Sequence, residues 1–349
     1  MLSQKQLSEL RVILQQSQNP LFFFDNDVDG LASFLLLRRF IERGKGVAIK
    51  SFPALSSTYS RKIYELKPDM IFVLDKPLIE KSFIQAAEEK NLPLIWIDHH
   101  EPQESKESKY AQYFNPLLGK KKSNEPATYW CYKITEKKDD EWIAMLGCIA
   151  DWYIPDFSTQ FAKKYPDLFG KIKDPAKALY KTEIGKIVKI LSFALKDRTS
   201  VVVRMLRFLF TVKSPYELLE KNEKTKSIYR RYEQINRKYI KLIERAKNIA
   251  KKKTKLLFFM YGGSLSLSGD IANELFYLFP KKVVVVAYVR GSKVNVSLRG
   301  KVDVREIAAR TMEAAGIKGS SGGHVNAAGA SFGIEDLPKF QNALTKLVG

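Results

Sequence analysis

The sequence predicts an α/β protein with an N-terminal parallel sheet, a helical linker and a smaller C-terminal α/β domain. Three short apolar stretches in the first hundred residues each end in acidic or histidine side chains, and helical patterns lie between them. This strand–helix–strand order is typical of parallel sheets. A second group of strands and helices begins near Lys255, after a long helical region.

Composition narrows the class of protein. A chain of 349 residues can form two domains, and its apolar fraction of 45% excludes wholesale disorder. The net charge of +21 indicates an anionic partner, first of all a nucleic acid, although a lysine-rich surface that serves solubility or heat tolerance fits equally well. Two cysteines, Cys131 and Cys148, make no disulfide framework, and no stretch resembles a membrane span or an apolar leader. We therefore expect a cytoplasmic protein.

The first strand ends in a cluster of acidic residues. Residues 3–16 have apolar side chains at helical spacing, and Pro20–Phe24 follows as a short buried strand. The sequence then reads Asp25-Asn26-Asp27-Val28-Asp29-Gly30, and Leu31–Phe40 is expected to form a buried helix with Ser33 as its cap.

Three carboxylates within five residues repel one another unless a cation neutralises them. The alternative is a solvated acidic turn. An EF-hand loop is excluded, because the twelfth position counted from Asp25 is Leu36 and not glutamate.

The same pattern recurs twice. Met70–Leu74 runs into Asp75, and Leu94–Ile97 runs into Asp98-His99-His100, with a surface helix expected over Leu78–Lys90. A buried strand that ends in unsatisfied polar side chains is unfavourable, and a metal ion satisfies imidazole and carboxylate together. Because parallel strands deliver their carboxyl ends to one crevice, these side chains and the first acidic cluster should meet there.

Helical patterns dominate the middle of the chain. Residues 141–153 indicate a helix that leads to Asp151, which is a ligand candidate only if this helix points at the crevice. Residues 160–215 are also helical in pattern. A seven-residue apolar repeat then predicts one long helix. Its members are Ile228, Tyr232, Ile235, Tyr239, Leu242, Ala246 and Ile249. Residues 216–255 carry 14 Lys/Arg against 5 Asp/Glu, so this helix is a docked linker, a nucleic-acid contact or both.

The C-terminal region predicts strands at Leu256–Tyr261 and Val283–Val289 with a helix over Asp270–Phe279 between them. Residues 293–299 alternate apolar and polar side chains and should pair with the preceding strand as a hairpin. A helix is expected over Val304–Ala315. The glycine-rich segment 316–329 that follows is read as a loop whose backbone can approach an anion.

In this order, these pieces resemble the DHH phosphoesterase superfamily. The resemblance rests on Asp98-His99-His100, the acidic residues 25–30, the strand-end Asp75 and the later Asp151. Residues 322–329 (Gly-Gly-His-Val-Asn-Ala-Ala-Gly) look like the signature of the DHH-associated C-terminal domain. The arrangement is most similar to RecJ-like nucleases and their archaeal relatives. It implies a DHH catalytic domain at 1–190, a helical linker at 191–254 and a substrate-binding domain at 255–349, with the active site in the cleft between the domains.

The resemblance also implies a site for two metal ions, usually Mn²⁺ and alternatively Mg²⁺. Asp27 and Asp29 would each hold one ion, Asp75 would bridge both, and Asp98 would orient His99. Asp25 stands where many relatives have a histidine, and it is expected to bind the first ion or to lie next to it. The implied metal ligands are Asp25, Asp27, Asp29, Asp75, His99 and Asp151.

Other residues are implied to contact the substrate phosphate. His100 would do so from the first domain, where it would face His324 across the cleft, and Arg299 would pair with the phosphate from the second domain. The implied catalytic set is Asp27, Asp29, Asp75, His99, His100 and Asp151, and the implied substrate-binding set is His100, Arg299, Gly322, Gly323 and His324. Ser321 replaces the first glycine of the family's triplet.

These roles lead to one expected function and several alternatives. The first is a Mn²⁺-dependent exonuclease that hydrolyses single-stranded DNA or RNA, with replication or repair proteins as further partners. The second is an oligoribonuclease or a cyclic-dinucleotide phosphodiesterase of the same superfamily. A non-catalytic replication scaffold is the third, and a pyrophosphatase fits the charge less well. The sequence leaves open the choice of DNA or RNA, the end that is attacked, the minimum substrate length and the oligomeric state.

Overall fold

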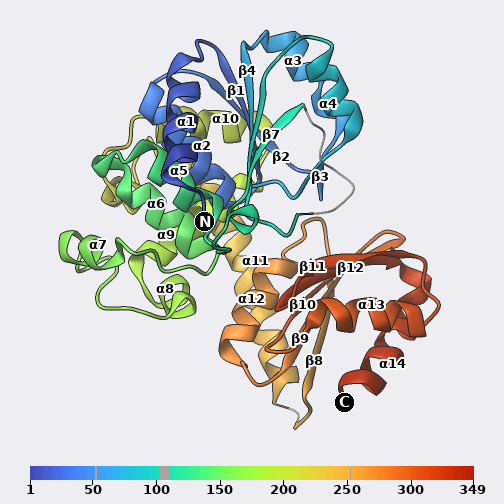
Figure 1. Cartoon of the computed structure of the whole chain (residues 1–349). Coiled ribbons are helices and arrows are strands. Elements are labelled where there is room, and N and C mark those ends of the chain that lie inside the picture. Colours follow the sequence, from blue (N-terminus) through green and yellow to red (C-terminus); the bar gives the residue numbers. More distant parts are fainter. Residues whose placement is uncertain (52, 103–109, 252) are drawn as a thin grey trace. The chain divides into compact units, whose positions relative to one another are not determined.

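The computed structural model describes residues 1–51, 53–102, 110–251 and 253–349. The chain forms two compact units, Met1–Tyr232 and Glu233–Gly349, and the long helix α11 (Lys226–Ala250) runs through the boundary (Figure 1). Residues 191–232 belong to the first unit. The three-part division with boundaries after residues 190 and 254 stays a prediction.

The first unit contains the expected parallel sheet. Its strands are β1 (Pro20–Asp25), β2 (Lys45–Ile49), β4 (Met70–Leu74), β6 (Leu94–Ile97) and β7 (Ala111–Phe114). They are all parallel, in the order β2-β1-β4-β6-β7. The three central strands are those that the sequence predicted. The edge strands β2 and β7 were missed, because most of their residues are partly exposed and they lack a continuous apolar run.

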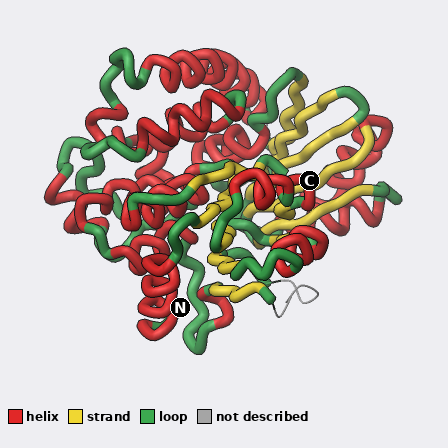
Figure 2. The backbone as a smooth tube through the Cα atoms, turned by 90° about the horizontal axis from the view of Figure 1, so that it is seen from above, coloured by secondary structure: helices red, strands yellow, loops and turns green. Residues whose placement is uncertain are grey.

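Helices surround this sheet, and Figure 2 shows that helix predominates in the N-terminal unit. They are α1 (Gln4–Gln16), α2 (Val28–Ile41), α3 (Arg61–Leu66), α4 (Lys81–Glu88), α5 (Ala127–Thr135), α6 (Glu141–Ala150), α7 (Ser158–Lys164), α8 (Pro175–Lys181), α9 (Glu183–Leu195) and α10 (Thr199–Leu209). A second, two-stranded sheet pairs β3 (Ala54–Leu55) with β5 (Leu78–Ile79). The surface helix expected from Leu78 therefore begins only at Lys81, since the two residues Leu78 and Ile79 pair as a strand.

Both faces of the central strands are buried, which explains why these segments are apolar throughout. Phe22 and Phe24 of β1 lie in the core with α2, α5, α6 and α9, whereas Leu21 and Phe23 pack in the core with α3 and α4. Figure 1 shows these two groups of helices on opposite faces of the strands. Successive side chains of a strand point to opposite faces, so one uninterrupted apolar stretch supplies both cores.

Helix α2 starts three residues earlier than expected. Asp27, and not Ser33, caps it, because the Asp27 Oδ1 accepts a hydrogen bond from the Gly30 N–H at 2.9 Å. Ser33 lies inside the helix. The helix also approaches β1 closely: a Cβ on Gly30 would lie 2.5 Å from the Asp25 carbonyl oxygen. The acidic cluster is therefore a strand end joined directly to a helix N-terminus.

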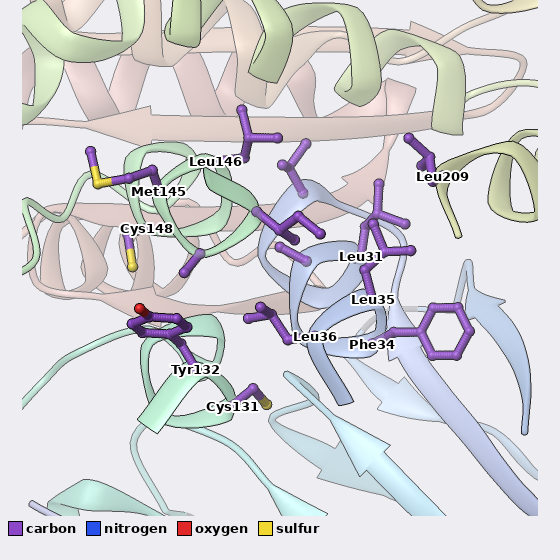
Figure 3. Packing of buried hydrophobic residues seen from close by; sticks show 14 of the residues in the cluster. Leu31, Phe34, Leu35, Leu36, Cys131, Tyr132, Met145, Leu146, Cys148 and Leu209 are labelled. Atoms are coloured by element: carbon purple, nitrogen blue, oxygen red, sulfur yellow. The ribbon is translucent and has the colours of Figure 1, made fainter. Parts of the chain in front are cut away.

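Helix α2 packs just as closely on α5 and α6. Figure 3 shows Leu31 and Leu35 of α2 among Met145 and Leu146 of α6 and other buried side chains. Helices α5 and α6 also pack closely on each other at Gly147 of α6, since a Cβ there would lie 2.1 Å from the Oγ1 of Thr128 in α5. This contact fixes the direction in which α6 leads to Asp151.

The second unit is the smaller α/β domain that the sequence predicted. Its strands are β8 (Leu256–Gly262), β9 (Val283–Arg290), β10 (Lys293–Arg299), β11 (Gly319–His324) and β12 (Ala327–Gly333), in the order β11-β12-β10-β9-β8. Only β8 and β9 are parallel to each other. The predicted β9–β10 hairpin is confirmed. Helices α12 (Ser268–Leu278), α13 (Val304–Ala314) and α14 (Leu337–Val348) complete the unit.

The reading of residues 316–329 as a loop is wrong. Residues 319–324 form the edge strand β11, which pairs with β12 through a turn at Val325 and Asn326. Glycine and serine weaken a strand, but β11 lies at a sheet edge and most of its residues are exposed, so this strand does not require apolar side chains.

The long helix is present, but its apolar repeat holds only over the first half. Ile228, Ile235 and Tyr239 are buried as expected. The buried series then continues with Ile243, Ala246 and Ala250, while Leu242 is only half-buried and Ile249 is exposed. A straight helix has 3.6 residues per turn, so a strict seven-residue repeat drifts off its buried side.

Within the described residues, no helix is long and apolar enough to cross a membrane.

Replacing Gly147 with alanine should destabilise the N-terminal unit by about 1–3 kcal/mol, because the new methyl group overlaps Thr128 in a closely packed core. Chemical denaturation of the full chain measures this change. Gly269→Ala is the matched control: this glycine also lies in a helix, α12, but its Cβ would meet nothing within 4 Å. Equal stability of the two variants would contradict the close packing of α6.

Candidate metal centre

The acidic and histidine side chains meet where the strand order reverses. The chain passes from β1 to β2 on one side and then to β4 on the other side of β1, so the ends of β1 and β4 flank a switch point. Asp25 is the last residue of β1, Asp75 follows β4, and His99 follows β6 by two positions. Asp151 caps the C-terminus of α6. These residues thus meet at the carboxyl edge of the sheet, where the sequence predicted the site.

One group of ligand atoms surrounds the His99 Nε2. The Asp75 Oδ1 lies 3.4 Å from this nitrogen, the Asp151 Oδ2 3.7 Å and the Asp29 Oδ2 3.8 Å. The last two distances are too long for hydrogen bonds. They suit donor atoms that share a cation, since ligands at about 2.0–2.2 Å from an ion lie roughly 3 Å or more apart. The donor set of imidazole and carboxylates fits Mn²⁺, Fe²⁺ or Zn²⁺.

A second group adjoins the first. Asp25, Asp27 and Asp75 each offer a carboxylate oxygen, and these oxygens all lie within 4.8 Å of one another. His100 also belongs to a group with Asp75 and His99. Asp75 thus adjoins both ends of the cluster, and the residues present fit two neighbouring cations.

Asp29 is fixed by a helix that the sequence did not reveal. Its Oδ1 accepts a hydrogen bond from the Thr128 N–H at 2.8 Å, and its Oδ2 accepts one from the Ala127 N–H at 3.0 Å. Both donors are in the first turn of α5, whose positive end favours a carboxylate. The Thr128 hydroxyl also donates to the Asp29 carbonyl at 2.9 Å. The only signal in the sequence is Pro126 directly before this helix.

The backbone at Asp75 adopts the left-handed region, with φ of 56°. Aspartate tolerates this region better than most residues, and the Asp75 N–H donates to the Ile97 carbonyl at 2.9 Å. The sheet therefore maintains the strained backbone that ends β4. Strain of this kind is concentrated at functional sites.

Asp98 orients the second histidine of the motif, which differs from the expectation that it would orient His99. The His100 ring donates from its Nδ1 to the Asp98 Oδ1 at 2.7 Å. The other oxygen of Asp98 accepts from the His100 N–H at 3.2 Å and from the Tyr113 hydroxyl at 3.1 Å. The reason is geometric: the ring of His99 turns its Nε2 toward the carboxylates, while that of His100 turns back toward its own strand end.

Crowding and burial shift the acid–base equilibria of this cluster. Burial, and after it the neighbouring carboxylates Asp29 and Asp27, raise the pKa of Asp75 well above its ordinary value. Burial also raises the pKa of Asp29 to about 6, although His99 opposes this shift. For His100, burial opposes the charged ring, but the carboxylate of Asp98 outweighs it and raises the pKa to about 9. Burial and crowding therefore disfavour the ionised carboxylates, and a bound cation would offset this effect.

Lys76 is a residue of this region that sequence reasoning missed. Its Nζ lies 3.1 Å from the Asp25 Oδ1 and donates to the Ser51 carbonyl at 2.9 Å. Its side chain is 0% exposed. Burial raises the pKa of Asp25 to about 6, followed in size by Asp27, while Lys76 lowers it. The signal in the sequence that could have indicated Lys76 is its position between the strand-end Asp75 and Pro77.

The substrate-binding residues expected in the second unit lie on neighbouring strands. Arg299 of β10 and His324 of β11 both pair with Ala327 of β12, so the three residues share one face of the sheet. The Arg299 Nε donates to the Asn273 Oδ1 at 2.5 Å, which fixes the guanidinium. Gly323 has φ of 131°, and a Cβ there would lie 2.5 Å from the Ala327 carbonyl oxygen. At Gly322 a Cβ would meet nothing within 4 Å.

Two protein-family models match this chain, one in its N-terminal half and one at its C-terminal end. Residues 21–149 match the N-terminal domain of the DHH family, and residues 253–349 match the DHHA1 domain. A comparison with curated protein sequences finds no match.

Several solved structures share the fold. RecJ from Thermus thermophilus in complex with Mn²⁺ is 15% identical with a TM-score of 0.71, covering 99% of this chain and 55% of that one. This chain thus spans about half the length of that RecJ. The exonuclease RecJ bound to manganese is 17% identical with a TM-score of 0.68, covering 99% and 95%.

CDC45 from Entamoeba histolytica is also similar in fold, at 11% identity and a TM-score of 0.55, with 98% of both chains covered. These similarities show the fold, and the two domain matches identify the family. The chain belongs to the DHH phosphoesterase superfamily, with a DHH domain followed by a DHHA1 domain and a RecJ-like fold.

Proposed function

We propose that this protein is a metal-dependent phosphodiesterase that hydrolyses single-stranded DNA or RNA as a RecJ-like exonuclease. The observation that carries the proposal is the convergence of Asp29, Asp75 and Asp151 on the His99 Nε2, at 3.4–3.8 Å. These residues come from four separate parts of the fold, and bound cations would relieve the repulsion among their carboxylates. RecJ structures hold Mn²⁺ or Mg²⁺, and we propose Mn²⁺, with Mg²⁺ as an alternative.

The ligands divide into two groups around Asp75. Asp27 and Asp75 would hold the first ion, and Asp29, His99 and Asp151 would hold the second, next to Asp75. When bound, the ions would lower the pKa of a water molecule and stabilise the charge that develops on the phosphate oxygens. The chain's own contribution is to hold these donors in place before substrate arrives. The backbone N–H groups that donate to Asp27 and Asp29 and the left-handed backbone of Asp75 do this.

His100 would contact the substrate phosphate. Its ring is 24% exposed, and Asp98 holds it through the Nδ1. The carboxylate of Asp98 raises the pKa of the ring and so favours its protonated form, which can donate a charged hydrogen bond to a phosphate oxygen. His100 thus binds and orients the phosphate without holding a metal ion.

The second unit would bind the remainder of the substrate. Arg299 is held by Asn273 and can offer further donors to a phosphate. Gly322 leaves open space above the strand, where His324 and backbone N–H groups could meet an anion. The net charge of +21 favours a polyanion over a small substrate.

Turnover of labelled nucleic acid tests the proposal. The protein with Mn²⁺ should shorten long single strands of DNA or RNA, labelled at the 5′ or the 3′ end, and Asp75→Asn should reduce the rate by at least about 1000-fold. Asp139→Asn, at an exposed position outside the cluster, should retain full activity. Turnover of only di- to pentanucleotides would instead assign an oligonucleotide phosphodiesterase. The absence of turnover with every metal would leave a non-catalytic scaffold.

His100→Gln should lower turnover by about 100-fold while Mn²⁺ binding, measured by calorimetry, stays unchanged. The physical reason is that glutamine keeps a donor but loses the positive charge beside the phosphate. Loss of one bound ion in this variant would show that His100 is a metal ligand instead.

The metal-free protein should lose stability as pH rises. The folded-state pKa values of Asp25 and Asp29 are about 6, above the ordinary 3.8, so the folded protein binds more protons than the unfolded chain in this window. The free energy of unfolding therefore falls as pH rises from 3.8 through about 6.

Asp75→Asn removes a crowded carboxyl group and should raise the melting temperature of the chelated protein at neutral pH. Adding Mn²⁺ should reverse the order of the two proteins. A lower melting temperature of the chelated variant at neutral pH would contradict the crowding.

A further inference from the structure

We propose that Lys76 is a positioning residue that binds Asp25 as a buried ion pair and so removes Asp25 from the metal ligands. The inference rests on the proposed metal centre and defines its charge. Lys76 then acts as a fixed internal cation at one end of the cluster, and the two metal ions are held by the other four aspartates together with His99.

The contacts of Lys76 fix its ammonium group beside Asp25. The Nζ lies 3.1 Å from the Asp25 Oδ1 and donates to the Ser51 carbonyl at 2.9 Å. The same Asp25 oxygen accepts a hydrogen bond from the Asn26 N–H at 2.8 Å. One oxygen of Asp25 is therefore engaged by two donors from the protein, and one of these donors is an ammonium group.

Burial restricts what Lys76 can do. Its side chain is 0% exposed, so it cannot touch a substrate phosphate. A lysine is almost never fully buried unless it is paired, because desolvation of an isolated ammonium group is costly. The Asp25 side chain is 20% exposed and borders the cluster. Lys76 thus acts on the metal centre through its contact with Asp25.

The backbone fixes this arrangement from the other side. Lys76 directly follows Asp75, whose left-handed φ of 56° redirects the chain at the end of β4. The Lys76 carbonyl accepts a hydrogen bond from the Trp96 Nε1 at 2.8 Å, and Pro77 restricts the backbone further. One segment therefore supplies both the shared metal ligand and the cation that neutralises Asp25.

Charge counting is compatible with this assignment. The carboxylate of Asp25 and the ammonium group of Lys76 form a neutral pair. Asp27, Asp29, Asp75 and Asp151 remain, with four negative charges that two divalent ions balance.

A double-mutant cycle with Mn²⁺ as the probe tests this. Metal-stripped full-length protein is titrated with Mn²⁺ by calorimetry for the wild type, Lys76→Met, Asp25→Asn and the double variant. Lys76→Met removes a positive charge and should bind Mn²⁺ about tenfold more tightly, whereas Asp25→Asn removes a negative charge and should bind about tenfold more weakly. The double variant restores neutrality and should bind within about threefold of the wild type.

The result that overturns the inference is a double variant that binds Mn²⁺ as weakly as Asp25→Asn, because Asp25 would then be a ligand. If Lys76→Met fails to fold, the comparison of Asp25→Asn with the double variant still decides. Lys186→Met, which breaks an exposed ion pair with Glu183 on α9, should leave Mn²⁺ affinity unchanged. A wild-type protein that binds no Mn²⁺ would instead overturn the proposed function, so the two failures are distinguishable.

Discussion

Repulsion among carboxylates that have lost their water is the constraint on which the centre depends. Five aspartates meet at the ends of β1, β4 and α6, and burial raises the pKa of those that are least exposed. A fold that brings such groups together without cations loses stability. The cluster is therefore stable in its ionised form only when positive charge is present. Lys76 supplies one unit of that charge from the protein, and metal ions would supply the rest.

The scaffold around the cluster serves to position these charges. Asp27 caps α2, and Asp29 accepts two backbone hydrogen bonds from the start of α5. Gly30 lets α2 approach β1, and Gly147 lets α6 approach α5. These contacts come from helix ends and close helix packing, so the donors are in place before any ligand binds. The same packing sets function against stability, since the groups proposed to bind metal would destabilise the metal-free protein.

The sequence was sufficient to predict the parallel sheet and the place of the cluster, because buried strands with polar ends have a strong pattern. It could not predict β2 and β7, whose residues are partly exposed, or the start of α2, where Asp27 is both cap and ligand candidate. The sequence also could not predict which side chains form pairs: Asp98 accepts a hydrogen bond from His100, and Lys76, which follows the neighbouring strand β4, contacts Asp25. Such pairings depend on the orientation of side chains in three dimensions, and a linear pattern carries no information on it.

The central claim is that four aspartates and His99 hold two metal ions while Asp25 is bound to Lys76. Anomalous diffraction from crystals of the full chain grown with Mn²⁺ tests it most directly. The account predicts two anomalous peaks, one beside Asp27 and Asp75 and one beside Asp29, His99 and Asp151, with the Asp25 Oδ1 still on the Lys76 Nζ. The absence of a peak in the cluster, or a peak coordinated by both oxygens of Asp25 with Lys76 displaced, would contradict it.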